Sequence, residues 1–318
     1  MRKSTTAVLP GKKNESKFST WLRSVKVNKA LLLMLIPGIL YYILFKYKPM
    51  YGVLIAFKEY NLIEGVSGSP WAGLKYFKMA FSQPDFWRVF KNTLILSAYK
   101  LIFTFPAPII LALMLNEVRC MKFKKTVQTL TYLPHFLSWV ILSGVVINFL
   151  SPSSGPVNMI IRQLGFEPIY FMGDKKYFRA ILVIGTIWKE VGWGTIVYLA
   201  ALTSVDTQLY EAAALDGAGR LRQTISVTLP AIANVVVIML IMRVGKIIND
   251  DFDQIYNMYN PSVYSVADVL STYIYKMGLE QAMYSYSTAM GLFKNLIAFT
   301  LVILTNAIST RVSDYGLW

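Results

Sequence analysis

Two charged residues, Lys189 and Glu190, stand in the middle of an apolar stretch of the sequence, with Trp188 and Trp193 beside them. A charge near the centre of a membrane segment costs about 2.5 to 3.5 kcal/mol on insertion scales, so such residues tend to face a cavity or a partner. Neighbours on a helix point about 100 degrees apart, so these two side chains cannot form one facing pair. Two hypotheses stay open: the residues line a translocation path, or they bond to neighbouring helices.

Other basic residues lie closer to the ends of apolar stretches, at Lys100, Arg243, Lys246 and Lys294. Long basic side chains there can extend to the water interface, and we expect this behaviour for most of them. Arg243 is kept as a further candidate for the translocation path. The single histidine follows Pro134, and this pair predicts a helix kink with a hydrogen-bonded His135 facing the bundle.

The composition identifies the kind of element that holds these residues. Of 318 residues, 55% are hydrophobic and 15% are charged, with a mean hydropathy of +0.47, which exceeds what a soluble protein of this length can bury. One cysteine and one histidine exclude a disulfide within the chain and any metal site built from several such residues. The net charge of +15 indicates a membrane surface as the partner rather than a nucleic acid.

The sequence predicts an all-α integral membrane protein with six transmembrane helices. Each apolar stretch is long enough to span a bilayer, which takes about 20 residues per helix. A cytoplasmic basic tail is expected at 1–29 and a transmembrane domain at 30–318, with spans at about 30–47, 92–116, 126–150, 180–203, 228–249 and 290–310.

Basic residues in the connections predict the orientation. The tail holds eight lysines and arginines, and with the N-terminus inside, the inner segments carry 15 basic residues against 11 outside. Because positive charge favours the cytoplasmic side, both termini are expected in the cytoplasm.

The connection at 204–227 is predicted to form a short cytoplasmic helix. Asp206 is a suitable N-cap, and Gly217 can adopt the left-handed conformation that ends a helix. Ala212 and Ala213 leave the backbone open to close approach, and Glu211 and Asp216 offer charge to a basic partner, the latter from just before the glycine. The alternative is an amphipathic connector lying on the lipid headgroups.

These residues resemble the EAA motif of permease subunits in bacterial ATP-binding-cassette importers. The match rests on Glu211-Ala212-Ala213, Gly217 and the closing Val227-Thr228-Leu229-Pro230, with valine in place of the usual isoleucine and Thr224 near the site of a frequent phenylalanine. The resemblance implies that Glu211, Ala212, Ala213, Asp216 and Gly217 couple the chain to a cytoplasmic ATPase. The sequence contains no phosphate-binding loop, so ATP-Mg is expected on that ATPase, with no cofactor on this chain and no enzymatic activity of its own.

Further segments resemble sugar permeases of the maltose type and, in particular, LplB-type polysaccharide permeases. They include Trp71-Ala72-Gly73-Leu74, Ala267-Asp268-Val269-Leu270 and the ending Asp314 to Trp318. The resemblance implies an oligosaccharide importer in a bacterial cell membrane. Its partners would be a homologous permease subunit forming a heterodimer, a cytoplasmic ATPase dimer, an extracytoplasmic substrate-binding protein and membrane lipid, with no nucleic acid.

Two questions stay open at this point. The alternative function is an ion-coupled secondary transporter with Glu190 and His135 as coupling groups, although the sequence shows no pair of matching halves. The cargo is also open: five basic residues against one acid in the spans suggest acidic saccharides such as uronic-acid oligomers. A neutral oligosaccharide is the preferred expectation, because some of these cations can snorkel and a partner permease can supply acids.

Overall fold

The computed structural model describes residues 27–248 and 252–313, with side chains to residue 311. Most of the predicted basic tail and the residues at 249–251 and 314–318 lie outside the described parts. The described chain is helical, with an isolated antiparallel bridge between Lys58 and Trp71. It divides into two units, at 1–54 and 55–318.

The first unit is a helical run. It contains α2 (Lys29–Tyr42), the π-helical turn η1 (Ile43–Tyr47), α3 (Lys48–Met50) and the start of η2 (Tyr51–Phe57). Pro37 lies inside α2. The stretch from Leu31 to Phe45 is apolar on all sides of the helix, as is typical of a helix that crosses lipid. The predicted span at 30–47 falls inside this helical run.

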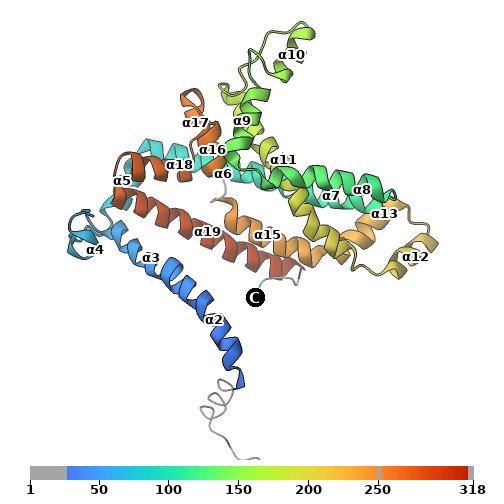
Figure 1. The fold of residues 1–318 in the computed structure, drawn as a ribbon, viewed down its shortest axis with the longest axis horizontal. Coiled ribbons are helices and arrows are strands. Elements are labelled where there is room, and N and C mark those ends of the chain that lie inside the picture. Colours follow the sequence, from blue (N-terminus) through green and yellow to red (C-terminus); the bar gives the residue numbers. More distant parts are fainter. Residues whose placement is uncertain (1–26, 249–251, 314–318) are drawn as a thin grey trace, which may run out of the picture. The chain divides into compact units, whose positions relative to one another are not determined.

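In the second unit, three stretches form long helices that could cross a membrane (Figure 1). They are α6 (Pro84–Thr104) continuing into α7 (Pro106–Glu117), α11 (Lys175–Leu202) and α19 (Tyr284–Ser313). Pro106 and Pro108 lie in the first turn of α7, where proline removes no helical hydrogen bond. The predicted spans at 92–116 and 290–310 lie within these helices, and the predicted span at 180–203 runs one residue beyond the end of α11. The helix that holds the span at 92–116 begins earlier than predicted, at Pro84.

Two further stretches are broken helices. The run from α8 (Met121–Tyr132) through the 3-10 turn η3 (Leu133–Phe136) meets α9 (Trp139–Phe149) at 108°. The run of α13 (Arg220–Gln223), η4 (Thr224–Thr228) and α14 (Leu229–Ala231) meets α15 (Ala233–Ile247) at 65°. By length and composition, the described residues therefore hold four helices able to cross a membrane, or up to six if each bent pair is one span. The kink predicted at Pro134-His135 is confirmed; the predicted stretch 126–150 is not one continuous helix, because Leu137 and Ser138 are extended.

Shorter elements connect these helices. They are α4 (Gly65–Gly68), α5 (Lys75–Ser82), α10 (Pro156–Gln163), α12 (Thr207–Leu215), α16 (Phe252–Met258), η5 (Pro261–Val263), α17 (Tyr264–Ala267), α18 (Leu270–Tyr275) and η6 (Lys276–Glu280).

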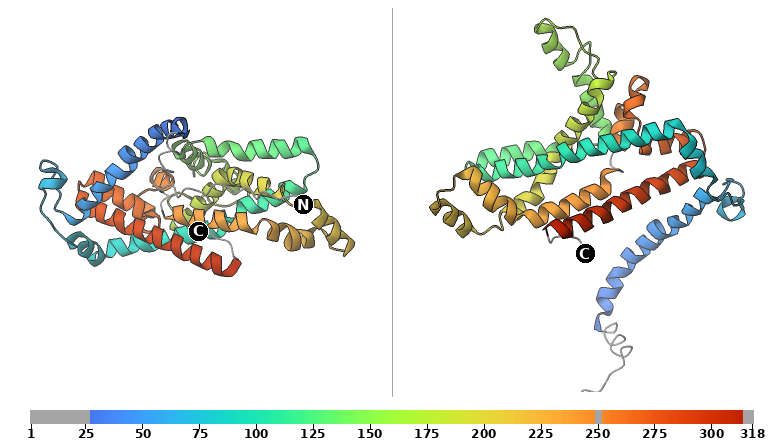
Figure 2. Two further views of the ribbon diagram at one scale, coloured as in Figure 1. Left: turned by 90° about the horizontal axis from the view of Figure 1, so that it is seen from below. Right: turned by 180° about the vertical axis from the view of Figure 1, so that it is seen from behind.

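Helix α11 is central to the second unit, since it packs against α6, α7, α8 and η3, while α15 packs against α19 (Figure 2). One apolar cluster joins α11 to α16 and η5, around Phe178, Leu182 and Ile255. Another joins α7, α11 and the start of α15, around Ala112, Tyr198 and Ile232. These two clusters fix the ends of α11, and its middle lies beside a cavity.

Candidate functional site

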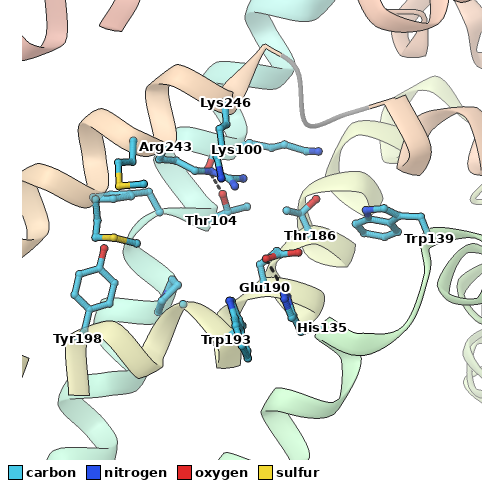
Figure 3. A pocket seen from close by; sticks show the side chains of 15 residues that line it. Lys100, Thr104, His135, Trp139, Thr186, Glu190, Trp193, Tyr198, Arg243 and Lys246 are labelled. Carbon is cyan, nitrogen blue, oxygen red and sulfur yellow. Dashed lines mark hydrogen bonds and ion pairs between the residues drawn. The ribbon is translucent and has the colours of Figure 1, made fainter. Parts of the chain in front are cut away.

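A cavity of about 460 Å³ lies between α6, α7, η3, α9, α11 and α15 (Figure 3). Its walls combine basic, aromatic and hydroxyl side chains from segments far apart in the sequence. They are Lys100, Thr104, Phe105, Pro108, His135, Trp139, Thr186, Glu190, Trp193, Gly194, Tyr198, Met239, Met242, Arg243 and Lys246.

One wall of the cavity is basic. Arg243 and Lys246 come from α15 at a three-residue spacing, which places them on one helix face, and Lys100 comes from α6 (Figure 3). The acid among the described lining residues is Glu190. The described lining therefore carries three basic side chains against one carboxylate.

Lys100 does not reach for an interface, contrary to the prediction that it snorkels. It is 2% exposed, and its ammonium donates to Gln254 Oε1 at 2.8 Å. Gln254 is itself fixed, because it donates to the Leu182 carbonyl at 2.7 Å and accepts from Thr186 at 3.0 Å. A buried ammonium needs such partners, and they come from α11 and α16, which the sequence does not place beside α6.

The facing wall combines a histidine, an acid and a tryptophan. His135 Nδ1 lies 3.3 Å from Glu190 Oε2, and the imidazole stacks on Trp193, with ring centres 4.5 Å apart and planes 1° apart. Figure 3 shows Glu190 and His135 directed toward each other beside the Trp193 ring. Trp193 covers the face of the imidazole and Glu190 lies at its edge, but His135 Nδ1 makes no hydrogen bond among the described residues, so the predicted hydrogen bond of His135 is not found.

Lys189 is buried beside the cavity but does not line it. Its ammonium donates to carbonyl oxygens of the break between η3 and α9, among them His135 O at 3.0 Å. Of the other predicted path residues, Glu190, Trp193 and Arg243 line the cavity. Trp188 does not, and it is 42% exposed on another side of α11.

Sequence reasoning missed several lining residues. Trp139 and Thr186 carry no signal of their own, since an aromatic or a threonine in an apolar helix usually packs or bonds to its own backbone. Lys246 had one available signal, its three-residue spacing from Arg243. Among the described residues, no group of three His, Cys, Asp or Glu side chains could hold a metal ion.

The second candidate site is α12 with the turn that follows it. Asp206 caps the helix as predicted, accepting from Gln208 N at 2.9 Å. No residue of α12 is buried, and Leu215 is 91% exposed. Glu211, Ala212 and Asp216 are exposed as well. A helix without a buried face gains little stability from its own packing, so this surface is available to a partner.

Gly217 ends α12 with a φ of +79°. The Gly217 amide donates to Ala214 O at 3.0 Å and the Ala218 amide to Ala213 O at 2.9 Å, the paired bonds of a Schellman motif. The predicted left-handed conformation is therefore confirmed. A hydrogen bond of 3.0 Å between the Tyr210 hydroxyl and Thr228 Oγ1 ties α12 to η4.

A comparison with protein families matches residues 88–314 to the binding-protein-dependent transport system inner membrane components. The matched region contains the cavity residues and all of α12. It confirms the resemblance to importer permeases predicted from the sequence.

Two curated relatives come from Bacillus subtilis (strain 168). Protein LplB is 48% identical over 299 residues, covering 94% of each chain. The polygalacturonan/rhamnogalacturonan transport system permease protein YteP is 47% identical over 291 residues, covering 92% of this chain and 91% of YteP.

A solved structure is also similar. It is a chain of a bacterial alginate ABC transporter in complex with alginate pentasaccharide-bound periplasmic protein, with 42% identity and a TM-score of 0.86 over 93% of this chain and 99% of that chain. Members of the family act with a binding protein and with ATPase subunits, which hydrolyse the ATP. The chain therefore belongs to the binding-protein-dependent transport system inner membrane components and is a membrane permease of an ATP-binding-cassette importer, not an enzyme.

Proposed function

We propose that this permease carries an acidic oligosaccharide of the uronate type. The observation behind the proposal is that three basic side chains from two helices, Lys100 of α6 and Arg243 and Lys246 of α15, line the cavity. The result shifts the preference away from a neutral cargo, because Lys100 is buried in the cavity wall and does not extend to an interface, and Lys246, although exposed, lines the same cavity.

The cavity offers contacts suited to such a cargo. A guanidinium binds a carboxylate through two parallel N–H bonds, and Arg243 supplies this group. Positive charge in a low-dielectric cavity also raises the local concentration of anions. The lining also includes Trp193, one face of which is covered by His135, and Trp139, and such aromatic side chains suit the apolar face of a pyranose ring.

The relatives support an acidic polysaccharide. YteP is named for polygalacturonan and rhamnogalacturonan, and a similar solved structure, 42% identical, is a transporter for the acidic polysaccharide alginate. The chain is also similar to an arabinooligosaccharides permease, AraP, but at 27% identity.

We further infer how the importer is assembled. The chain pairs with a homologous permease in the lipid bilayer, and α12 docks on a cytoplasmic ATPase dimer that binds ATP-Mg. Glu211 and Asp216 meet basic groups of the ATPase, Ala212 and Ala213 allow close approach, and Gly217 holds the turn. The exposure of α12 and its Schellman end support this assignment.

Cargo charge is tested by uptake into proteoliposomes that hold the complete importer with saturating binding protein. An acidic oligosaccharide is compared with its carboxyl-reduced counterpart of equal length. For the double variant Arg243→Gln/Lys246→Gln, we expect acidic uptake to fall by about tenfold or more, which corresponds to about 1.4 kcal/mol, with reduced-oligomer uptake unchanged. Lys294→Gln, whose lysine is not in the cavity lining, is the control. Equal loss of both cargoes, or no loss, contradicts the proposal.

The orientation has a separate test. With both termini in the cytoplasm, a reporter active only there should work near Asp216 and after Trp318. It should not work near Gly68, Asp174 or Asp268. Cytoplasmic activity near Asp268 would contradict the six-span topology.

A further inference from the structure

The break between η3 and α9 leaves backbone carbonyls without helical partners. Leu137 and Ser138 are extended, so the regular helical hydrogen-bond pattern stops here: Pro134 O still accepts from Leu137 N at 3.2 Å, but His135 O and Leu137 O lie where the helical pattern is interrupted. Ser138 caps the start of α9 by accepting from Ile141 N at 3.4 Å, which serves the amide side of the break. In a membrane, each carbonyl left unsatisfied would cost several kcal/mol.

Lys189 satisfies the carbonyl side of the break. Its ammonium donates to Leu137 O and, at 3.0 Å, to His135 O, with a longer contact of 3.5 Å to Pro134 O. An ammonium has three donors and no acceptor, which matches this set of three carbonyls. It also lies 5.6 Å from the centre of the Trp139 ring, a cation–π distance.

The same face of α11 approaches the broken segment closely. Gly185 and Gly192 lie four residues before and three residues after Lys189, so the three share one face. A Cβ on Gly192 would lie 2.1 Å from Thr131 O, and one on Gly185 would lie 4.0 Å from the Trp139 ring. Gly192 therefore allows α11 to come near enough for the lysine to reach the break, whereas the tighter contact of a Cβ on Gly185 would be with Gln254 Nε2, at 3.3 Å.

The next residue of α11 holds the same segment from inside the cavity. Glu190 lies 3.3 Å from the His135 imidazole, whereas Lys189 binds the His135 backbone. Because the two side chains point in different directions around α11, Lys189 contacts the main chain of η3 and Glu190 contacts the His135 side chain. His135 and Trp139, the lining residues on either side of the break, are thereby fixed in the cavity wall.

We propose that Lys189 is a positioning residue of the importer: it fixes the broken segment as a wall of the cavity and does not recognise the cargo. This rests on the proposed function of the cavity. In this proposal the buried Lys189 ammonium of α11 binds backbone carbonyls of the protein itself, while Arg243 and Lys246 recognise the charge of the cargo.

The test compares Lys189→Arg and Lys189→Met with Arg243→Gln in the same importer, with uptake expressed per assembled complex. We expect Lys189→Met to lower uptake of the acidic and the carboxyl-reduced oligosaccharide by the same factor, about tenfold or more. Lys189→Arg, which keeps the charge and the donors, should recover most of it. A lysine needed only for folding would lower the amount of complex and leave uptake per complex unchanged.

Two outcomes overturn the proposal. Uptake per complex at the wild-type level in Lys189→Met would show that the wall does not need the lysine. A selective loss of acidic cargo in Lys189→Met, like that expected for Arg243→Gln, would make Lys189 a cargo contact. If Arg243→Gln alone fails to alter the preference for acidic cargo, the proposed function fails and the positioning role is still judged by its own variants.

A second measurement does not depend on assembly of the importer. His135→Cys is introduced together with Cys120→Ser, since Cys120 is the cysteine of the chain, and its labelling by a water-soluble thiol reagent is timed in membranes. Lys189→Gln should change the labelling rate by about threefold, which corresponds to about 0.65 kcal/mol in barrier, and Lys294→Gln should not. An unchanged rate in Lys189→Gln contradicts the positioning role.

Discussion

The cavity and the α12 segment differ in how they are built. The cavity gathers side chains from α6, η3, α9, α11 and α15, and its charged groups contact other elements, as Lys100 contacts Gln254. In α12, the cap at Asp206 and the turn at Gly217 bond within a few residues, and no side chain is buried. A change in the cavity should therefore alter cargo or packing, whereas a change in α12 should alter coupling and leave the fold intact.

The largest effect should come from Gly192→Ala, which tests how closely the broken helix is held. The new Cβ would lie 2.1 Å from Thr131 O and 2.4 Å from its carbonyl carbon, so backbone must move. We expect the free energy of unfolding to fall by about 3 kcal/mol, at the upper end of overpacking effects, measured by thermal unfolding in detergent.

Gly144→Ala is the matched control for that change. Gly144 is also helical, and a Cβ there would meet nothing within 4 Å. Stability should be unchanged or raised by up to about 1 kcal/mol, because alanine favours a helix more than glycine. Equal stability of the two variants would contradict the close packing of α11 against α8 at Gly192.

The next effect concerns the turn after α12. Gly217→Val places a β-branched residue at a φ of +79°, a strain of about 1 to 3 kcal/mol that should displace the turn. We expect the chain to reach the membrane in normal amounts and uptake to fall severalfold, as measured by uptake normalised to the amount of protein.

Gly219→Val separates backbone strain from added bulk. A Cβ at either glycine has nothing within 4 Å, but Gly219 has a φ of −69°, which valine adopts without strain. Uptake should therefore remain near the wild-type level. Equal loss in both variants would attribute the effect to added bulk on the proposed ATPase-docking segment and not to the turn.

The smallest effect should follow loss of the ion pair between Arg220 and Glu117. Its atoms are 2.9 Å apart, and both side chains are more than half exposed. Exposed pairs contribute about 0 to 1 kcal/mol, so Arg220→Ala should barely alter thermal unfolding. A loss comparable to that of Gly192→Ala would mean that the α12 segment is integrated into the core.

The difference between α12, which is built from local contacts, and the cavity, which is built from long-range contacts, explains what the sequence could predict. Caps, positive-φ glycines and apolar stretches are local signals, so α12, its ends and the candidate spans could be recognised. The role of Lys189 could not, since its carbonyl partners lie more than 50 residues away and exist because a helix breaks there. Pro134 predicted the kink, but not that the bend would reach 108°.

Lys100 shows the same limit. Near the end of an apolar stretch, a lysine that snorkels and one that is buried look alike in sequence. The deciding partner, Gln254, lies 154 residues away. Long-range contacts of this kind set which cations face the cavity, and they determine the expected cargo.

The most direct measurement of the central claim compares cargo-stimulated ATP hydrolysis by the reconstituted importer in two variants, Glu211→Lys in α12 and Arg243→Gln in the cavity. With acidic and carboxyl-reduced oligosaccharides of equal length, Glu211→Lys should lower stimulation by both cargoes in the same proportion. Arg243→Gln should lower it for the acidic cargo alone. If Glu211→Lys alters the preference between cargoes, or Arg243→Gln lowers both equally, the separation of coupling from cargo recognition is contradicted.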